Sequence, residues 1–322
     1  MLQAVAGLSL THVVTGDPGR QDQARQDVPG VEVLDAAEAL WRRAEEYDVV
    51  VVATPNDSHL PLAMAALELG KTTVVDKPMA RTADEAARLA SLAAELGVAL
   101  TVFHNRRWDS DTLTAAALLS EGLLGEVVRL ESRFTRFRPE VAPRWRERAG
   151  AGGGVLLDLG SHLVDQALHL LGPVTHVYAE VDLRRPAAEV DDDCFLAMTH
   201  TSGARSHLWC SMTAPAPGPR LLLQGARAGW VKDDLDGQED ALRAGLPAGG
   251  APPEPPGRLT DAGGTRQVAS LAGDWPAFYR GVVDAVAGAA GVPVRPEDGV
   301  RVLRVLEAAR RSAASRQVVP LP

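Results

Sequence analysis

Lysine, cysteine and long apolar runs are scarce in this sequence of 322 residues, and each scarcity excludes a class of protein. No apolar run approaches the roughly 20 residues that a helix needs to cross a bilayer, so we expect no membrane segment. The first residues lack the charged and apolar regions of a secretory signal, which favours the cytoplasm. The two cysteines, Cys194 and Cys210, lie in strand-like segments without ligand-like spacing, and we expect buried thiols rather than a redox or zinc pair.

Positive charge is also in the minority. The chain has 33 Lys and Arg against 42 Asp and Glu, a net charge of −9, which argues against a nucleic acid partner and favours a small-molecule ligand. Only Lys71, Lys77 and Lys232 are lysines, so 30 of those 33 basic residues are arginines. Because lysine alone offers a compact ammonium whose pKa shifts readily, each lysine is a candidate for a specific role.

Up to about residue 104, short β-branched runs alternate with amphipathic helical stretches, which predicts an α/β fold with a doubly wound parallel sheet. Asp35, Asn56 or Asp57, and Thr82 are expected to begin helices, and Gly97 to end one. The predicted strands are almost continuously apolar, as strands covered on both faces should be, and they span residues 8–14, 31–34, 49–53, 72–75 and 99–103.

From residue 105 onward strand-like segments follow one another at hairpin-like spacing, which predicts an α+β domain with an open, mainly antiparallel sheet. We therefore expect two domains, over residues 1–104 and 105–322. The stretch 248–264 is dense in Pro and Gly and is expected to form a surface loop or lid. Helices over about 274–289 and 296–316 are expected to close the chain.

Two of the predicted parallel strands end in polar residues. Asp76 and Lys77 follow one strand, and in an open parallel sheet ligands bind beyond the carboxyl ends of the strands. A second strand end, residues 52–59, offers a hydroxyl, an amide and a helix N-terminus that can hold phosphate and ribose oxygens. The alternative for Asp76 and Lys77 is a surface charge pair before a turn, and the alternative for residues 52–59 is an ordinary Asx-type turn and cap.

A helix predicted near residues 159–171 brings Asp158, His162, Asp165 and His169 onto one face. An Asp one turn before a His can orient the imidazole and raise its basicity, as a general base for a hydroxyl proton requires. Asp and His are also suitable ligands for a divalent metal, so a metal-dependent enzyme using Asp158 and His162 is an alternative. A capped helix with a solvated polar face is the third interpretation.

Taken together, several segments resemble the Gfo/Idh/MocA oxidoreductases over nearly the whole chain, and resemble in particular the branch with NADP-linked scyllo-inositol dehydrogenases. The segments that carry this resemblance are Ala53-Thr54-Pro55-Asn56, Asp76-Lys77-Pro78, His104-Asn105-Arg106-Arg107-Trp108, Gly122-Leu123-Leu124-Gly125-Glu126-Val127, Arg144-Trp145-Arg146-Glu147 and residues 153–165.

The resemblance implies a Rossmann domain for the dinucleotide over residues 1–104 and a domain for substrate binding and oligomerisation over 105–322. It implies hydride transfer between nicotinamide and a sugar or polyol carbon, with Lys77 beside the reacting oxygen, His162 as acid/base and Asp158 in support. A homodimer or homotetramer through the second-domain sheet is expected. The residues implied to contact the cofactor, besides Lys77, are Thr54, Pro55, Asn56, His59, Asp76, Asn105 and Arg106.

The strand with a GxGxxG-type turn, with which members of this family begin, is missing here, because residues 1–5 read as the tail of the first helix. We expect either an N-terminally truncated gene model or a weak cofactor binder, and exposed edges on the neighbours of the missing strand. At the end of the strand 8–14, Thr15 and Arg20 favour NADP, whereas Asp17 would suit NAD. A non-catalytic sensor of a sugar or dinucleotide is the remaining alternative.

Overall fold

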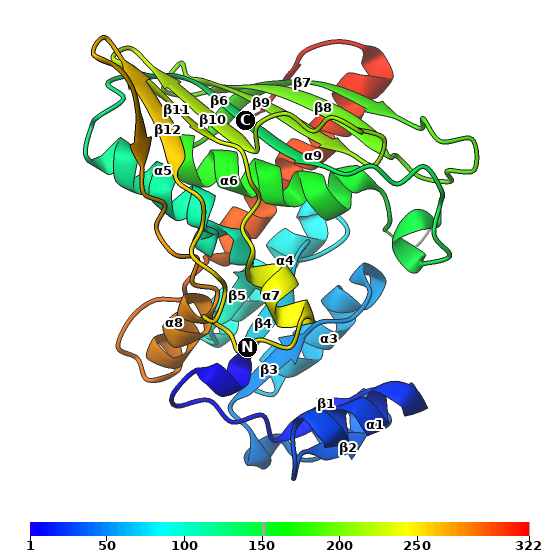
Figure 1. Ribbon diagram of the computed structural model, residues 1–322. Coiled ribbons are helices and arrows are strands. Elements are labelled where there is room, and N and C mark those ends of the chain that lie inside the picture. Colours follow the sequence, from blue (N-terminus) through cyan, green and yellow to red (C-terminus); the bar gives the residue numbers. More distant parts are fainter. Residues whose placement is uncertain (150–151, 322) are drawn as a thin grey trace.

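The computed structural model describes residues 1–149 and 152–321, and its first part is built from parallel strands (Figure 1). Strand β1 pairs only with β2, while β3, β4 and β5 pair in that order, so the described strands form two parallel sheets. The strands are β1 (His12–Val14), β2 (Glu32–Leu34), β3 (Val49–Val52), β4 (Thr72–Asp76) and β5 (Leu100–Phe103). The helices between them are α1 (Pro18–Asp27), α2 (Ala37–Trp41), α3 (His59–Glu68) and α4 (Ala83–Leu96), with short 3₁₀ turns η1 (Leu2–Ala4), η2 (Ala44–Glu46) and η3 (Asn56–Ser58).

A cavity of about 520 Å³ separates the two parallel sheets, and residues of both β1 and β3 line it. The predicted doubly wound parallel arrangement is therefore confirmed, with an interruption between β1 and β3. The edges of these two strands that face the cavity have no strand partner among the described residues, as the sequence led us to expect.

Local signals in the sequence explain most of the helix ends. The Thr82 hydroxyl accepts a hydrogen bond from the Glu85 N–H, and Gly97 ends α4 in the left-handed conformation, both as predicted. The prediction that Asp35 begins a helix is wrong, because the residue before α2 is the extended Ala36. Asp17 instead begins α1, where its carboxylate accepts from the Arg20 N–H.

The second part of the chain carries a nine-stranded sheet in the order β13-β12-β11-β10-β6-β9-β8-β7-β14. Only the central pair β6 and β9 is parallel, so the prediction of a mainly antiparallel sheet is confirmed. Figure 1 shows α5 (Ser110–Ser120), α6 (Ser161–Leu171) and α9 (Pro296–Ser315) covering one face of this sheet. The strands are β6 (Val127–Thr135), β7 (Val174–Asp182), β8 (Asp193–His200), β9 (Arg205–Ser211), β10 (Leu221–Gly225), β11 (Ala228–Lys232), β12 (Gly257–Asp261), β13 (Gly264–Val268) and β14 (Val319–Pro320).

Alternation along β8 and β9 decides which side chains enter the core. Cys194 and Leu196 in β8 are buried on the face that the helices cover, while Phe195 is half-buried on the opposite face. Cys194 lies opposite Cys210 in the strand register, and both are free, buried thiols, as expected.

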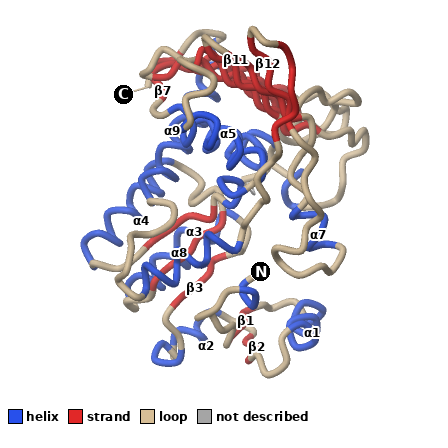
Figure 2. Tube along the Cα trace, turned by 60° about the vertical axis from the view of Figure 1, so that its left-hand side comes forward, coloured by secondary structure: helices blue, strands red, loops and turns tan. Residues whose placement is uncertain are grey.

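The predicted surface loop over residues 248–264 is wrong in its second half, which begins a β-hairpin. After α7 (Gln238–Arg243) the chain enters β12 and β13, which extend the large sheet (Figure 2). Gly264 takes a positive φ of 112° in the turn, and a side chain on Gly257 would meet the Trp230 indole at 2.3 Å. The glycines therefore serve a tight turn and a close contact within a sheet, which composition alone does not distinguish from a loop.

The closing helices contact both parts of the chain. Rings of Phe278 and Tyr279 on α8 (Pro276–Val286) lie 4.9 Å and 5.4 Å from the Phe103 ring at the end of β5. Helix α9 packs on α4 of the first part and on β7 of the second. The domain boundary near residue 104 stays a prediction, because these late elements contribute to both sides of it. None of the described helices is both long enough and apolar enough to cross a membrane.

Candidate active site

The ammonium of Lys77 and the carboxylate of Asp158 meet where the parallel sheet faces the second part of the chain. Lys77 directly follows β4, and Asp158 lies in a π-helical turn, η6 (Leu156–Gly160), that leads into α6. Lys77 Nζ donates to the Asp158 backbone oxygen at 2.7 Å and to its carboxylate Oδ1 at 2.9 Å. Two of the three predicted catalytic residues, 81 positions apart in the sequence, are therefore in direct contact.

The turn that carries Asp158 is held by a buried carboxylate. Asp191 Oδ2 accepts from the Leu156 N–H at 2.7 Å, and its Oδ1 accepts from Arg310 at 3.2 Å. Gly154 has a φ of 102°, and a Cβ there would lie 2.4 Å from Asp191 Oδ1, so only glycine fits. A single-turn π-helix inside a helix is frequent at functional sites, because it changes the direction in which the side chains point.

Opposite charges keep Asp158 ionised. Burial acts to raise its pKa, but Lys77, through its charge and hydrogen bond, and Arg146, 3.4 Å away, outweigh burial and hold the pKa below its usual range. The carboxylate is therefore negative at neutral pH and faces two cations.

His162 lies one turn further along, buried within α6. Its ring stacks near Phe134, with centroids 6.3 Å apart, and its Nδ1 has no hydrogen-bond partner among the described residues. Burial, followed by the charges of Lys77 and Arg106, lowers the pKa of His162 well below its ordinary value, so the imidazole is neutral at neutral pH. A buried nitrogen without a partner calls for a ligand or a water molecule.

The expectation that Asp158 orients His162 is wrong, because the Asp158 carboxylate turns to Lys77 and Arg146 and has no hydrogen bond with the imidazole. The π-helical turn breaks the regular helical spacing on which that expectation depended.

Further along the predicted stripe, Asp165 serves a different purpose. It accepts three hydrogen bonds from the Arg107 guanidinium, at 2.6 Å, 3.0 Å and 3.2 Å, and Arg107 also reaches Asp298 on α9 at 3.3 Å. This ion pair joins α6 and α9 to the 3₁₀ turn η4 (Asn105–Trp108) after β5. Asp165 and Arg107 thus hold the elements around the site together.

The metal alternative gains no support from the part of the chain that the structure describes. There, the one group of three ligating side chains with atoms within 4.8 Å of one another is His12, Glu32 and Glu46. These residues belong to β1, β2 and η2 and do not include Asp158 or His162.

The residues predicted to hold the adenosine end lie at the carboxyl end of β1. The Asp17 N–H donates to Thr15 Oγ1 at 3.3 Å, and Asp17 Oδ1 accepts from the Arg20 N–H at 3.0 Å. Since this bond caps α1, one carboxylate oxygen of Asp17 is engaged within the chain.

The loop after β3 is held by His59 and Asn56. His59 is buried, and its Nδ1 and Nε2 lie 2.9 Å from the carbonyl oxygens of Pro78 and Thr54, respectively. Both ring nitrogens thus join the loops after β3 and β4, and a contact of His59 with cofactor stays a prediction. Asn56 donates to the Gly152 oxygen at 3.1 Å, and Thr54 and Pro55 border the same loop.

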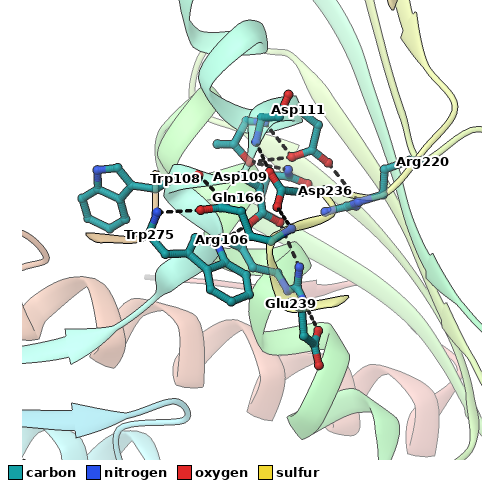
Figure 3. A network of polar contacts seen from close by, with 12 residues as sticks. Arg106, Trp108, Asp109, Asp111, Gln166, Arg220, Asp236, Glu239 and Trp275 are labelled. Atoms are coloured by element: carbon teal, nitrogen blue, oxygen red, sulfur yellow. Dashed lines mark hydrogen bonds and ion pairs between the residues drawn. The ribbon is translucent and has the colours of Figure 1, made fainter. Parts of the chain in front are cut away.

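Asp76, Asn105 and Arg106 complete the predicted cofactor set. Asp76 Oδ1 accepts from the Lys77 N–H at 2.8 Å at the end of β4, and Asn105 is buried in η4. The buried guanidinium of Arg106 donates to Asp109 and to Glu239, each at 2.9 Å (Figure 3). Arg106 is therefore paired within the chain, and its cofactor contact also stays a prediction.

A buried polar network around Arg106 was missed by sequence reasoning. Trp275 Nε1 donates to Asp109 at 2.7 Å, and Arg220 reaches Asp111 at 3.0 Å (Figure 3). Burial raises the pKa of Asp109 to about 7. The Asp109 to Trp275 bond spans 166 positions, so no local signal could have revealed it.

Two family models match the sequence. Residues 1–104 match the oxidoreductase family with an NAD-binding Rossmann fold, and residues 112–231 match the GFO/IDH/MocA C-terminal domain. The first match covers the part with the parallel sheets, and the second covers the elements of the other part from α5 to β11.

Individual relatives agree with the family models. The chain is 37% identical to the scyllo-inositol 2-dehydrogenase (NADP(+)) IolW of Bacillus subtilis, over 94% of this chain and 86% of that protein. It is 38% identical to the uncharacterized oxidoreductase YdgJ of Escherichia coli, over 96% and 93% of the two chains. The solved structure of yvaA from Bacillus subtilis superposes with a TM-score of 0.93 at 35% identity, covering 100% of this chain and 93% of that one.

Proposed function

Because the chain belongs to the Gfo/Idh/MocA family of NAD(P)-dependent oxidoreductases, we propose that it catalyses hydride transfer at a sugar or polyol carbon, with an inositol-like ring as first substrate. The observation that carries this proposal is the Lys77–Asp158 pair beside the buried His162, whose Nδ1 has no partner among the described residues. The predicted catalytic set of Lys77, Asp158 and His162 is retained, with Asp158 acting on Lys77 rather than on His162.

His162 exchanges the substrate hydroxyl proton. Since burial and neighbouring cations lower its pKa, the imidazole is neutral and one ring nitrogen is free to accept a proton. The unpartnered Nδ1 is fully buried, whereas Nε2 has no hydrogen bond among the described residues and is not fully buried. Nε2 is therefore the nitrogen that a substrate can reach, and the tautomer with hydrogen on Nδ1 leaves it as an acceptor.

Lys77 stabilises negative charge that develops on the substrate oxygen. An ammonium has three N–H donors, and Asp158 takes two of them through its backbone oxygen and its carboxylate. The third is left for the reacting oxygen, and the Asp158 contacts fix its direction. Only a tenth of the Lys77 side chain is exposed, so the charge acts in a poorly solvated site.

The polar residues around the site suit a nicotinamide dinucleotide, because they follow the carboxyl ends of β1, β3, β4 and β5, where such ligands bind. The His162 Nδ1 without a hydrogen-bond partner also fits a site that a ligand completes. Bound nicotinamide supplies the hydride chemistry. We propose NADP, with NAD possible, since Thr15 and Arg20 suit a 2′-phosphate and one Asp17 oxygen is engaged in capping α1. The residues proposed to hold the dinucleotide are Thr15, Asp17, Thr54, Pro55, Asn56, His59, Asp76, Lys77, Asn105 and Arg106.

The open face of the nine-stranded sheet supports a homodimer or homotetramer. Half-buried Phe195 and Trp209 on that face lie with ring centroids 5.2 Å apart, and Arg133 lies 4.0 Å over the Trp209 ring. We propose that a second copy covers this cluster, as aromatic side chains and Arg are enriched at interfaces. Light scattering should give the wild type a mass that is a multiple of the chain mass, and the Trp209→Glu variant a lower mass. A monomeric mass for both proteins would contradict the proposed oligomer.

A turnover screen tests the proposed function directly. Inositols, aldoses and sugar alcohols are offered with NADP⁺ and NAD⁺, and formation of the reduced cofactor is followed by absorbance. We expect turnover of at least one polyol or sugar, and a loss of about 10²- to 10⁴-fold in the His162→Ala variant. Full activity of that variant, or no turnover of any CH–OH substrate, would count against the proposal.

A further inference from the structure

Three arginines surround one aromatic ring beside the candidate active site. The guanidinium carbons of Arg106, Arg136 and Arg220 lie 4.6 Å, 5.1 Å and 5.7 Å from the centre of the Phe134 ring. The same ring lies 6.3 Å from the His162 ring, so the arginines gather next to the proposed proton acceptor. This much positive charge in one place requires neutralisation.

Two of the three guanidiniums are neutralised within the chain. Arg106 donates to Asp109 and Glu239, and Arg220 pairs with Asp111 at 3.0 Å and donates to Ser132 at 2.6 Å. These pairs are buried parts of the network in Figure 3. The charges of both guanidiniums are therefore balanced by carboxylates of the chain itself.

Arg136 differs from both. It follows the last residue of β6, and its side chain is half-buried. Its guanidinium lies over the Phe134 ring and has no hydrogen bond or ion pair among the described residues. Burial, followed by the charge of Arg138, lowers the pKa of Arg136, while Glu239 and Asp158 act in the opposite direction. Its guanidinium lies over the Phe134 ring, which is the neighbour of the His162 ring, so Arg136 lies close to the candidate active site.

The two carboxylates whose charges act on Arg136 are both engaged by other cations. Asp158 faces Lys77 at 2.9 Å and Arg146 at 3.4 Å, and Glu239 accepts from Arg106 at 2.9 Å, so Arg136 adds a cation with no carboxylate of its own among the described residues. A neutral polyol would leave this charge uncompensated, and would leave a half-buried guanidinium without an acceptor. A ligand with an anionic group would supply the acceptor and balance the charge.

We propose that the sugar or polyol ring on which the enzyme acts carries an anionic group, a carboxylate or a phosphate, and that this group pairs with Arg136. This inference depends on the proposed function, since it names the substrate class of the same site. A planar guanidinium presents two parallel N–H donors, which match two oxygens of either group. Arg136 is then a specificity-determining residue that binds away from the reacting carbon.

The test compares matched pairs of substrates on the wild-type enzyme and the Arg136→Gln variant. Each pair is an uronate or a sugar phosphate with the neutral sugar of the same ring configuration, offered with NADP⁺. We expect higher kcat/KM for the anionic member in the wild type. Arg136→Gln should lower that value by about 10- to 100-fold, mostly through KM, because a charge-assisted hydrogen bond contributes roughly 1.5–3 kcal/mol. The neutral sugar should change little.

Two further variants keep the test selective. Arg88→Gln removes the same charge from an exposed position on α4 and should leave the preference intact. Arg136→Lys keeps the charge without the paired donors and should restore part of the affinity.

The two proposals fail in different ways. If the wild type prefers the neutral sugars, or if Arg136→Gln leaves the anion preference unchanged, the inference about Arg136 is overturned while the oxidoreductase function stands. Calorimetric titration with the uronate and with the sugar phosphate gives the second readout. Binding that Arg136→Gln weakens, without turnover in the wild type, would support the anion site and count against the proposed function.

Discussion

Replacing Lys77 by methionine removes the ammonium from the candidate site while keeping the length of the side chain. The wild-type ammonium donates two hydrogen bonds to Asp158, at 2.7 Å and 2.9 Å, and only 10% and 23% of the two side chains are exposed. Each such charged bond contributes roughly 1.5–3 kcal/mol, and Arg146 stays near the carboxylate and compensates for part of the loss. We therefore expect Lys77→Met to lower the free energy of unfolding by about 2–3 kcal/mol.

A double-mutant cycle with Asp158→Asn separates the pair from its surroundings. The coupling between Lys77→Met and Asp158→Asn in the free energy of unfolding should be about 1–3 kcal/mol. Urea unfolding followed by circular dichroism measures it. Lys71→Met is the matched control, because the Lys71 ammonium lies 5.5 Å over the Tyr47 ring and has no ion pair among the described residues. Lys71→Met should lower the free energy of unfolding by less than about 1 kcal/mol.

Turnover of the same variants tests the catalytic role. If Lys77 holds its third N–H toward the reacting oxygen, Lys77→Met should lower kcat by about 10²- to 10³-fold, as loss of a donor to a developing oxyanion does. Coupling below about 0.5 kcal/mol would refute the structural part of the reasoning. Wild-type turnover in Lys77→Met would refute the catalytic part, whatever the stability.

Three further predictions concern the surroundings of the site. Because the pKa of His162 lies well below its ordinary value, the imidazole stays neutral and kcat/KM should stay constant from about pH 8 to pH 6. A fall of kcat/KM to half its value near pH 6.5 would contradict this. Asp165→Asn should cost about 3–5 kcal/mol at pH 7, measured by urea unfolding. Since the folded pKa of Asp165 is lowered, the wild-type advantage should be present above about pH 4 and vanish as the pH falls further; a constant difference would contradict it. Gly154→Ala should lower the melting temperature more than Gly203→Ala does. Both glycines have a positive φ, but only at Gly154 does the added Cβ meet a carboxylate, at 2.4 Å. Equal decreases in melting temperature would show that backbone strain alone matters.

The succession of elements could be predicted from the sequence, because its signals are local. Thr82 and Gly97 mark the ends of α4 through their own hydrogen bond and backbone conformation, which depend on a few neighbouring residues. The apolar runs of β3, β4 and β5 could be recognised because the strands of a parallel sheet are largely covered on both faces. The hairpin of β12 and β13 was missed because its two glycines are needed for reasons that composition does not show. Gly257 makes room for the distant Trp230 indole, and Gly264 supplies the positive φ of the turn.

Of the candidate site, the sequence by itself determined which residues have the chemistry to take part. The rarity of lysine singled out Lys77, and a helical repeat singled out Asp158 and His162. Only the tertiary structure decided their pairing. The π-helical turn directs Asp158 to Lys77 instead of His162, and folding alone brings residues 81 positions apart together.

The balance of charge was also decided by tertiary structure. Arg106, Arg136 and Arg220 are alike as sequence in that each is an arginine near a strand or turn, and the sequence does not show which of them is left without a carboxylate. Arg106 pairs with the nearby Asp109 and with the distant Glu239, and Arg220 pairs with the distant Asp111, whereas no carboxylate lies within hydrogen-bond distance of Arg136 among the described residues. Electrostatic pairing acts over a few ångströms in space and is independent of separation along the chain, so the sequence sets the charges and the fold decides which of them is left for a ligand.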